Sequence, residues 1–280
     1  GLHEAGCVAL SNARTPFKDS YVLRRAMEYA ATYDIPLFLQ PDDVSLSAGG
    51  CMHDGPVATR MGLSGISATA ETIALAQILL MTEQTGARVH ISQISCARSL
   101  KMLGNAKDNG INVTADTPLA NLVYTEESVQ GFNSLFNVQP PLRSEADRQA
   151  LLAAVNAGEL AISSNHRPHE IAAKKAPFAD AEAGMSMFDS FLPLALQLVE
   201  KGELSLSALI NAVSNRPAAI LGMEQSLKEE SWFNAALIDP QAVRSVSKSS
   251  LYSKGKNSPL NNQDVKGSVI AVFVDGRRVF

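Results

Sequence analysis

The sequence lacks the features of a membrane-spanning, secreted or nucleic-acid-binding protein. No apolar run in its 280 residues approaches the roughly 18 residues that span a bilayer. The opening stretch, GLHEAGCVAL, has no basic region and only a short apolar run, so it does not resemble a signal peptide. Lys and Arg (24) are outnumbered by Asp and Glu (28), and the resulting net charge of −4 argues against nucleic acid or an anionic membrane as the main partner.

Cysteine is scarce as well. Only Cys7, Cys51 and Cys96 occur, an odd number at wide spacing with no CxxC pair. This pattern excludes a disulfide framework and favours a reducing, cytoplasmic environment. We expect each of the three side chains to be a small buried apolar group.

Short apolar runs alternate with segments of helical periodicity. Helices are predicted at 19–33, 67–86, 96–110, 144–158, 186–201 and 205–214, with a short one at 215–222. Strands are predicted at 7–11, 35–40, 88–95, 111–116 and 160–165, and a loop rich in Gly, Ser and Met lies between residues 40 and 67. Such alternation indicates parallel strands joined by crossover helices.

The last 60 or so residues differ from this pattern. FNAALID (233–239) and GSVIAVFVDGRRVF (267–280) are strand-like, the second with an Asp275–Gly276 turn, and the stretch between them is polar. We therefore predict an α/β domain over residues 1–225 and a small β appendage, part of a β-sandwich, over 226–280.

Polar residues stand where the predicted strands end, which is where parallel α/β barrels carry their functional side chains. They are Ser11 or Asn12, Gln40 with Asp42 and Asp43, Gln93, Asp116, and Asn165 with His166 and His169. A divalent-metal hydrolase needs imidazole and carboxylate ligands at such positions. Three of these positions carry neutral amides instead, which are weak ligands.

Several motifs along the chain resemble those of long-chain (type I) dihydroorotases of the amidohydrolase superfamily, over the later two-thirds of that family's length. The motifs are LFLQPDD, GGCMHDGPVATRMGLSGISATAE, ARVHISQIS, VTADTPLANLVYTEE, NVQPPLR, SSNHRPHE and the closing YSKGKNSPL…VKGSVIAVFVDGRRVF. Hydantoinases and allantoinases share the layout, but SKGKNSP fits dihydroorotase better. The resemblance implies a (β/α)8 TIM-type barrel of the metal-dependent hydrolase kind, with its N-terminal part and an HxH metal motif upstream of this chain.

The resemblance also implies which positions would form the site. The metal-binding histidines of the family fall on Gln40 and Gln93, and the aspartate that binds metal and acts as general base falls on Asn165. A histidine pair falls on Ala120 and Asn121, and a substrate-contacting asparagine falls on Gln139. His169 keeps the family residue. Because an amide has no useful basicity near pH 7, we expect vestigial positions, no catalytic residue and no bound metal.

Other residues permit two interpretations each. His166 and His169 could bind a metal with Asp42 or Asp43, or His169 could be a hydrogen-bonded remnant. Asp42 and Asp43 could form an acid/base pair, but loop caps are expected. We predict that His90 is a packing histidine with satisfied hydrogen bonds, and that Lys174 and Lys175 are solvated loop charges.

The resemblance favours an inactive dihydroorotase-like protein of pyrimidine biosynthesis. Inactive homologues of this kind associate with the catalytic chain of aspartate transcarbamoylase, so that chain, self-association or both are the expected partners. The alternative is an active dihydroorotase or related cyclic amidohydrolase with an atypical site, which would contain zinc as its cofactor. A third hypothesis is a small-molecule sensor that uses the same pocket without turnover.

Overall fold

A five-stranded parallel sheet forms the centre of the chain. The computed structural model describes residues 4–12, 15–223, 227, 229 and 232–280. The sheet has the order β1-β2-β5-β6-β7, and every neighbouring pair is parallel. Its strands are β1 (Leu10–Ser11), β2 (Leu37–Leu39), β5 (Val89–Ile91), β6 (Val113–Pro118) and β7 (Ala161–Ser163). The predicted parallel arrangement is confirmed, although four of the strands are shorter than predicted and β6 has the predicted length but begins and ends two residues later.

The helices between these strands begin and end where the sequence predicts. They are α1 (Ser20–Thr32), α4 (Ala68–Thr85), α5 (Ala97–Asp108) and α7 (Glu145–Asn156). Asp19, Ser67 and Ser144 each accept a backbone N–H at a helix N-terminus, while Gly86 ends α4 in the left-handed conformation. Local capping chemistry therefore sets the start of α1, α4 and α7 and the end of α4, whereas α5 begins after Cys96 without a cap from that side chain.

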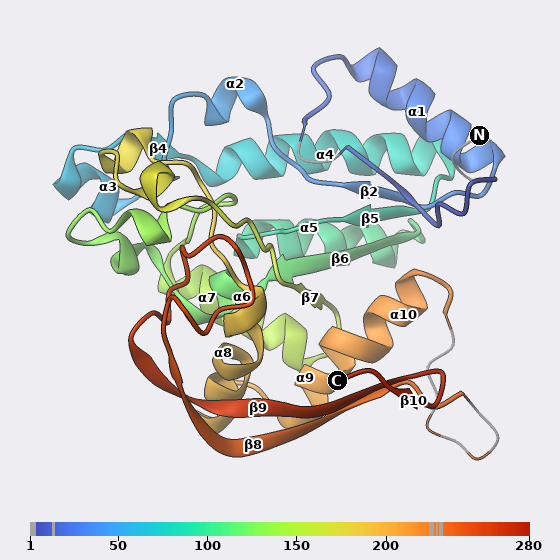
Figure 1. The fold of residues 1–280 in the computed structure, drawn as a ribbon. Coiled ribbons are helices and arrows are strands. Elements are labelled where there is room, and N and C mark those ends of the chain that lie inside the picture. The colour runs from blue at the N-terminus through green and yellow to red at the C-terminus, as the bar shows by residue number, and fades with distance from the viewer. Residues whose placement is uncertain (1–3, 13–14, 224–226, 228, 230–231) are drawn as a thin grey trace.

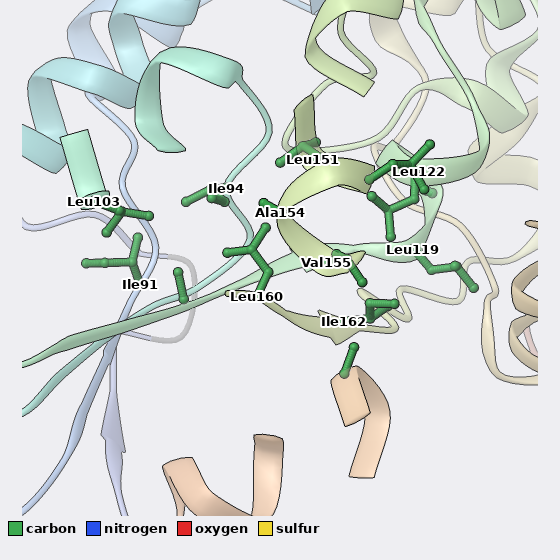
Figure 2. Packing of buried hydrophobic residues seen from close by; sticks show 14 of the residues in the cluster. Ile91, Ile94, Leu103, Leu119, Leu122, Leu151, Ala154, Val155, Leu160 and Ile162 are labelled. Carbon is green, nitrogen blue, oxygen red and sulfur yellow. The ribbon is translucent and has the colours of Figure 1, made fainter. Parts of the chain in front are cut away.

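The main hydrophobic core lies between the sheet and these helices. Alternate strand residues point outward to the helices, among them Leu37 and Leu39 of β2 and Val89 and Ile91 of β5, and all four are buried. Figure 2 shows how side chains of α5, α6 (Leu119–Val123) and α7 meet those of β5 and β7. Each fully buried side chain of this size contributes about 1.5–3 kcal/mol, so this layer is a main source of the stability of the sheet.

The segment between residues 40 and 67 is not a plain loop, and this prediction is wrong. It forms α2 (Val44–Ser47), β3 (Met52–His53), α3 (Pro56–Met61) and β4 (Gly65–Ile66), with β3 parallel to β4. A separate hydrophobic cluster, here called the satellite cluster, lies beneath it: Cys51, Met52, Val57, Ala58, Val129 and Phe178. Elements of two to six residues are too short to show a period, so only their packing reveals them.

The C-terminal part is an antiparallel sheet of β8 (Ala235–Val246), β9 (Gln263–Val274) and β10 (Arg277–Arg278). It packs on α8 (Phe188–Glu200), at the opposite end of the molecule from α1 and α4 (Figure 1). The predicted turn is present, with Asp275 and Gly276 both at positive φ. Gly267 is required where β9 meets α8, because it has a φ of +102° and an added Cβ would lie 2.5 Å from Leu196 Cδ1.

The remaining helical segments follow α6, β7 and α8. They are 3-10 turns at Glu126–Val129, Ser134–Phe136, Ile171–Lys174 and Phe178–Asp180, then α9 (Leu206–Ile210), a π-helical turn (Asn211–Asn215) and α10 (Arg216–Ile220). The predicted helices at 205–214 and 215–222 are thus one continuous helical run. The predicted domain boundary at 225/226 touches residues 224–226, which are outside the described part of the chain, and the two-domain division stays a prediction.

The three cysteines differ in their environments. Cys51 and Cys96 are buried, as predicted, but Cys7 is exposed, so the prediction for Cys7 is wrong. Burial, together with the nearby Glu71 carboxylate, raises the pKa of the Cys96 thiol to about 11. Among the described residues, no helix is long and apolar enough to cross a bilayer.

Candidate functional site

The polar residues predicted at the strand ends do gather on one face. Gln40 follows β2 and lines a small cavity together with Asp42 and Gln139. Gln139 Nε2 donates to Asp42 Oδ2 at 3.0 Å, and Asn165 Nδ2 donates to the carbonyl of Gln139 at 2.9 Å. The cavity is about 20 Å³, room for about one water molecule. Asn165, Gln139 and Asp42 are therefore linked in a row of hydrogen bonds along one side of this small cavity.

Asp116 organises the neighbouring part of this face. Its Oδ1 accepts from the backbone N–H of Gln93 at 3.1 Å and from the Ser163 hydroxyl, and its Oδ2 lies 2.8 Å from His90 Nε2. The other ring nitrogen of His90 lies 2.8 Å from the Thr114 hydroxyl. His90 and Asp116 are both buried, so the predicted packing histidine with satisfied hydrogen bonds is confirmed.

Two of the predicted site residues have unusual backbone conformations. Gln93 has a φ of +62° and Asn165 a φ of +43°, both in the left-handed region. Gln93 is held there by the Asp116 carboxylate, and its Oε1 is a buried acceptor without a hydrogen-bond partner. Sequence reasoning placed Asp116 at a strand end but did not predict that groups from both neighbouring strands, β5 with the residues after it and β7, would bond to it.

His166 and His169 face different parts of the backbone. His166 Nδ1 accepts from the N–H groups of Met187 and Phe188 at 3.0 and 3.2 Å, and its ring stacks on Phe188 at 4.1 Å. It therefore caps the N-terminus of α8. His169 Nε2 lies 3.0 Å from the Ala183 carbonyl, which supports the interpretation of His169 as a hydrogen-bonded remnant.

The paired aspartates have separate roles. Asp43 caps α2 by accepting from the N–H groups of Ser45 and Leu46, as predicted. Asp42 is not a cap and faces Gln139 in the cavity described above, so the cap prediction is wrong for Asp42. Burial raises the pKa of the Asp42 carboxyl. Asp42 and Asp43 therefore do not form a shared acid/base pair.

The donor set of this face does not fit zinc. Zinc sites in proteins use thiolate, imidazole and carboxylate ligands, whereas Gln40, Gln93 and Asn165 offer neutral amides. Within the described ranges, no three or more His, Cys, Asp or Glu side chains group in a way that could hold a metal ion. Ala120 and Asn121, at the expected histidine-pair positions, are buried in α6, and Asn121 Nδ2 donates to the Pro141 carbonyl at 2.9 Å.

Sequence comparisons agree with the motifs. The family profile described as "Dihydro-orotase-like" matches residues 1–99. A "Dihydroorotase-like protein" of Pseudomonas aeruginosa is 44% identical over 277 residues, which cover 98% of this chain and 65% of that protein. A protein of the same name from Pseudomonas putida is 43% identical with the same coverage, and a dihydroorotase of Syntrophus aciditrophicus is 38% identical over 281 residues, covering 66% of its length.

The chain belongs to the dihydroorotase-like family. It spans about two-thirds (65%) of the length of the two Pseudomonas relatives.

Solved structures show the fold. L-hydantoinase from Arthrobacter aurescens superposes with a TM-score of 0.85 at 21% identity, covering 99% of this chain and 66% of that one. Dihydroorotase from Saccharomyces cerevisiae gives a TM-score of 0.71 at 17% identity, covering 92% of this chain and 68% of that one. The parallel sheet thus has the TIM-barrel amidohydrolase architecture, as predicted.

A buried ion pair beside this face was missed by sequence reasoning. Glu71 and Arg143 are 4% and 3% exposed, and their charged groups lie 3.9 Å apart. Glu71 accepts from the backbone N–H groups of Ser95 and Cys96, and from the Ser95 and Ser99 hydroxyls. The only signal in the sequence was an acidic residue in the first turn of the 67–86 helix.

Arg143 extends this network to β3 and β4, which lie over the satellite cluster. Its Nη1 donates to the Ile66 carbonyl at 2.7 Å and lies 3.1 Å from His53 Nδ1, and its Nε donates to the Ser95 hydroxyl at 3.0 Å. Burial, and then the Arg143 cation, lower the pKa of His53. One guanidinium therefore joins β3 and β4 to the end of β5.

Lys174 is not a solvated charge, and that prediction is wrong. Its ammonium donates to the carbonyls of Ser134, Asn137 and Glu182. Burial lowers the pKa of Lys174 to about 8. Lys175, its neighbour, is exposed as predicted.

The stabilisation that His166 gives to the N-terminus of α8 is expected to depend on pH. Burial lowers the pKa of His166 below its ordinary 6.5, and Nδ1 accepts two N–H groups only while it carries no proton. The stabilisation is fully present above pH 6.5 and is lost as the pH falls through the lower pKa of the folded state. We expect His166→Asn to keep the cap through its side-chain oxygen and to remove this part of the pH dependence.

The measurement is urea unfolding of both proteins between pH 5 and 7.5, with the difference between their unfolding free energies plotted against pH. Taking the difference removes the contribution of His53, whose pKa is lowered in both proteins. A difference that does not change with pH would refute the assigned role of the imidazole.

Proposed function

We propose that this chain is part of a catalytically inactive dihydroorotase-like protein of pyrimidine biosynthesis. In this proposal the protein acts as a structural or regulatory partner of the aspartate transcarbamoylase catalytic chain, alone or together with self-association. The vestigial roles of Gln40, Gln93, Asn165, Gln139 and His169 are part of the same proposal.

The hydrogen bond made by the Asn165 side chain is the strongest support for this proposal. Asn165 Nδ2 donates to the Gln139 carbonyl at 2.9 Å. An ionised carboxylate has no hydrogen to donate, so an aspartate at this position would face the carbonyl oxygen with a negative charge. The site is therefore built around an amide at the position where the hydrolases of this family would need a base.

The neighbouring positions support the same conclusion. Gln40 and Gln93 are neutral, so three positions that would supply metal ligands lack both the charge and the basicity of His and Asp. The chain is also more similar to the two proteins named dihydroorotase-like, at 44% and 43% identity, than to the dihydroorotase of Syntrophus aciditrophicus at 38%.

The test is co-purification of the natural protein that carries this sequence with the aspartate transcarbamoylase catalytic chain of the same organism. We expect the two proteins to elute as a single peak in gel filtration at micromolar concentration. When this protein is left out, we expect the assembly of aspartate transcarbamoylase catalytic chains to be lost. Two separate peaks would count against the partnership.

The 38% identity to a dihydroorotase favours one alternative, an active cyclic amidohydrolase with an atypical site. It requires about one zinc per chain by elemental analysis and hydrolysis of dihydroorotate to N-carbamoyl-aspartate. Metal-free protein without turnover would exclude it and leave the structural role in place.

A further inference from the structure

Residues 166–185 connect β7 to α8 and are held by three separate sets of contacts. This segment is called the strap below. In Figure 1 it runs from the end of β7 to short helical turns beside α3 and β4. Each set of contacts joins the strap to a different part of the chain.

Asn257 holds the base of the strap. It is 3% exposed, and its Oδ1 accepts from the His169 backbone N–H at 2.9 Å. Its Nδ2 donates to the carbonyls of Arg167 and Gly184 at 3.2 and 3.1 Å. Both ends of the strap are thus bonded to one buried side chain of the C-terminal segment.

Lys174 and Asn137 hold the middle of the strap. The Lys174 ammonium donates to the carbonyls of Ser134 and Asn137 at 3.0 and 3.2 Å. Asn137 Nδ2 donates in return to the carbonyls of Phe178 and Ala181 at 3.0 and 2.9 Å. These reciprocal bonds fix the strap against residues 133–139, the segment that also carries Gln139.

Phe178 holds the tip of the strap. Its side chain is 3% exposed and packs in the satellite cluster beside Met52 and Val57. Lifting the strap would expose this ring to water and leave buried amide groups unpaired, and both changes are unfavourable.

We propose that the strap is a permanently closed brace between β7 and the satellite cluster, and that it does not open as a lid. The Lys174 ammonium is its central fastening, because this one group bonds to three separate carbonyls. The proposal goes beyond the function proposed above, because it concerns the mobility of this face whether or not a partner chain binds.

The test is hydrogen–deuterium exchange with mass spectrometry on the natural protein at pH 7. We expect strap peptides of the wild type to exchange at least about 100-fold more slowly than unstructured peptides, as for other closed segments. Lys174→Met removes the ammonium but keeps the length of the side chain, and we expect it to speed exchange in the strap about tenfold or more. Lys175→Met, at the exposed neighbouring position, is the matched control and should leave exchange unchanged.

Two results of this experiment would overturn the proposal: wild-type strap peptides that exchange like unstructured chain, or equal exchange in the Lys174→Met and Lys175→Met variants.

If Lys174→Met does not fold, trypsin treatment of the wild type tests the proposal instead. A closed strap predicts cleavage after Lys248, in an exposed turn, well before cleavage after Lys175. Early cleavage after Lys175 in the native protein would refute the closed strap.

Discussion

Replacing Arg143 with methionine is expected to lower the free energy of unfolding by about 3–5 kcal/mol, the cost typical of breaking a buried ion pair from one side. The variant keeps most of the side-chain volume but leaves the Glu71 carboxylate, which is 4% exposed, without its nearby cation. It also removes the donors to the Ile66 carbonyl and the Ser95 hydroxyl. Urea unfolding followed by circular dichroism measures the change.

The double variant Glu71→Gln with Arg143→Met is the control for this prediction. Without the carboxylate no buried charge is left unpaired, so we expect the double variant to be more stable than Arg143→Met alone. We also expect the Cys51 thiol, buried in the satellite cluster, to react faster with a thiol reagent in Arg143→Met. A loss of under about 1 kcal/mol, which is in the range of an exposed pair, would show that the network is not a major source of stability.

Replacing Asp116 with alanine is expected to cost about 2–4 kcal/mol, since three groups in a buried or part-buried setting lose their shared hydrogen-bond partner. Those groups are the Gln93 N–H, the Ser163 hydroxyl and the His90 ring. The left-handed backbone of Gln93 should relax as well, because the carboxylate is the group that holds its N–H.

The isosteric variant Asp116→Asn separates hydrogen bonding from charge. Its oxygen can still accept from Gln93 and Ser163, and its amide can donate to His90, so a loss of only about 1 kcal/mol is expected. Both variants are compared with the wild type by urea unfolding at pH 7. Equal losses for alanine and asparagine would mean that the negative charge, rather than the set of hydrogen bonds, holds the strand ends together.

Local signals in the sequence were sufficient for much of the barrel. Ser67, Gly86 and eighteen helical residues between them specify α4 without reference to the rest of the chain. The alternation of strands and helices then implied a parallel sheet, and the motifs around Gln40, Gln93 and Asn165 implied the family. Each of these features depends on residues that are near one another in the sequence.

Contacts between segments that are far apart in the sequence could not be predicted from local patterns. Asp116 meets His90 across 26 positions, Asn165 meets Gln139 across 26, and His169 meets Asn257 across 88. The satellite cluster was missed for the same reason, because Cys51, Val129 and Phe178 come from three separate stretches. Lys174 was wrongly predicted to be solvated. Its three partners are backbone carbonyls, and no pattern of side chains in the sequence identifies them.

The class of fold, the long helices and the amides at the strand ends follow from the sequence, because periodicity, capping and residue chemistry act over a few neighbouring positions. What those amides do depends on contacts between distant segments. Asn165 donates to a backbone carbonyl, Asp42 faces Gln139, and Asp116 rather than a metal-ligand position gathers the strand ends. These roles follow from which strand ends the sheet and its loops bring within hydrogen-bonding distance, and that distance is set by packing over the whole chain.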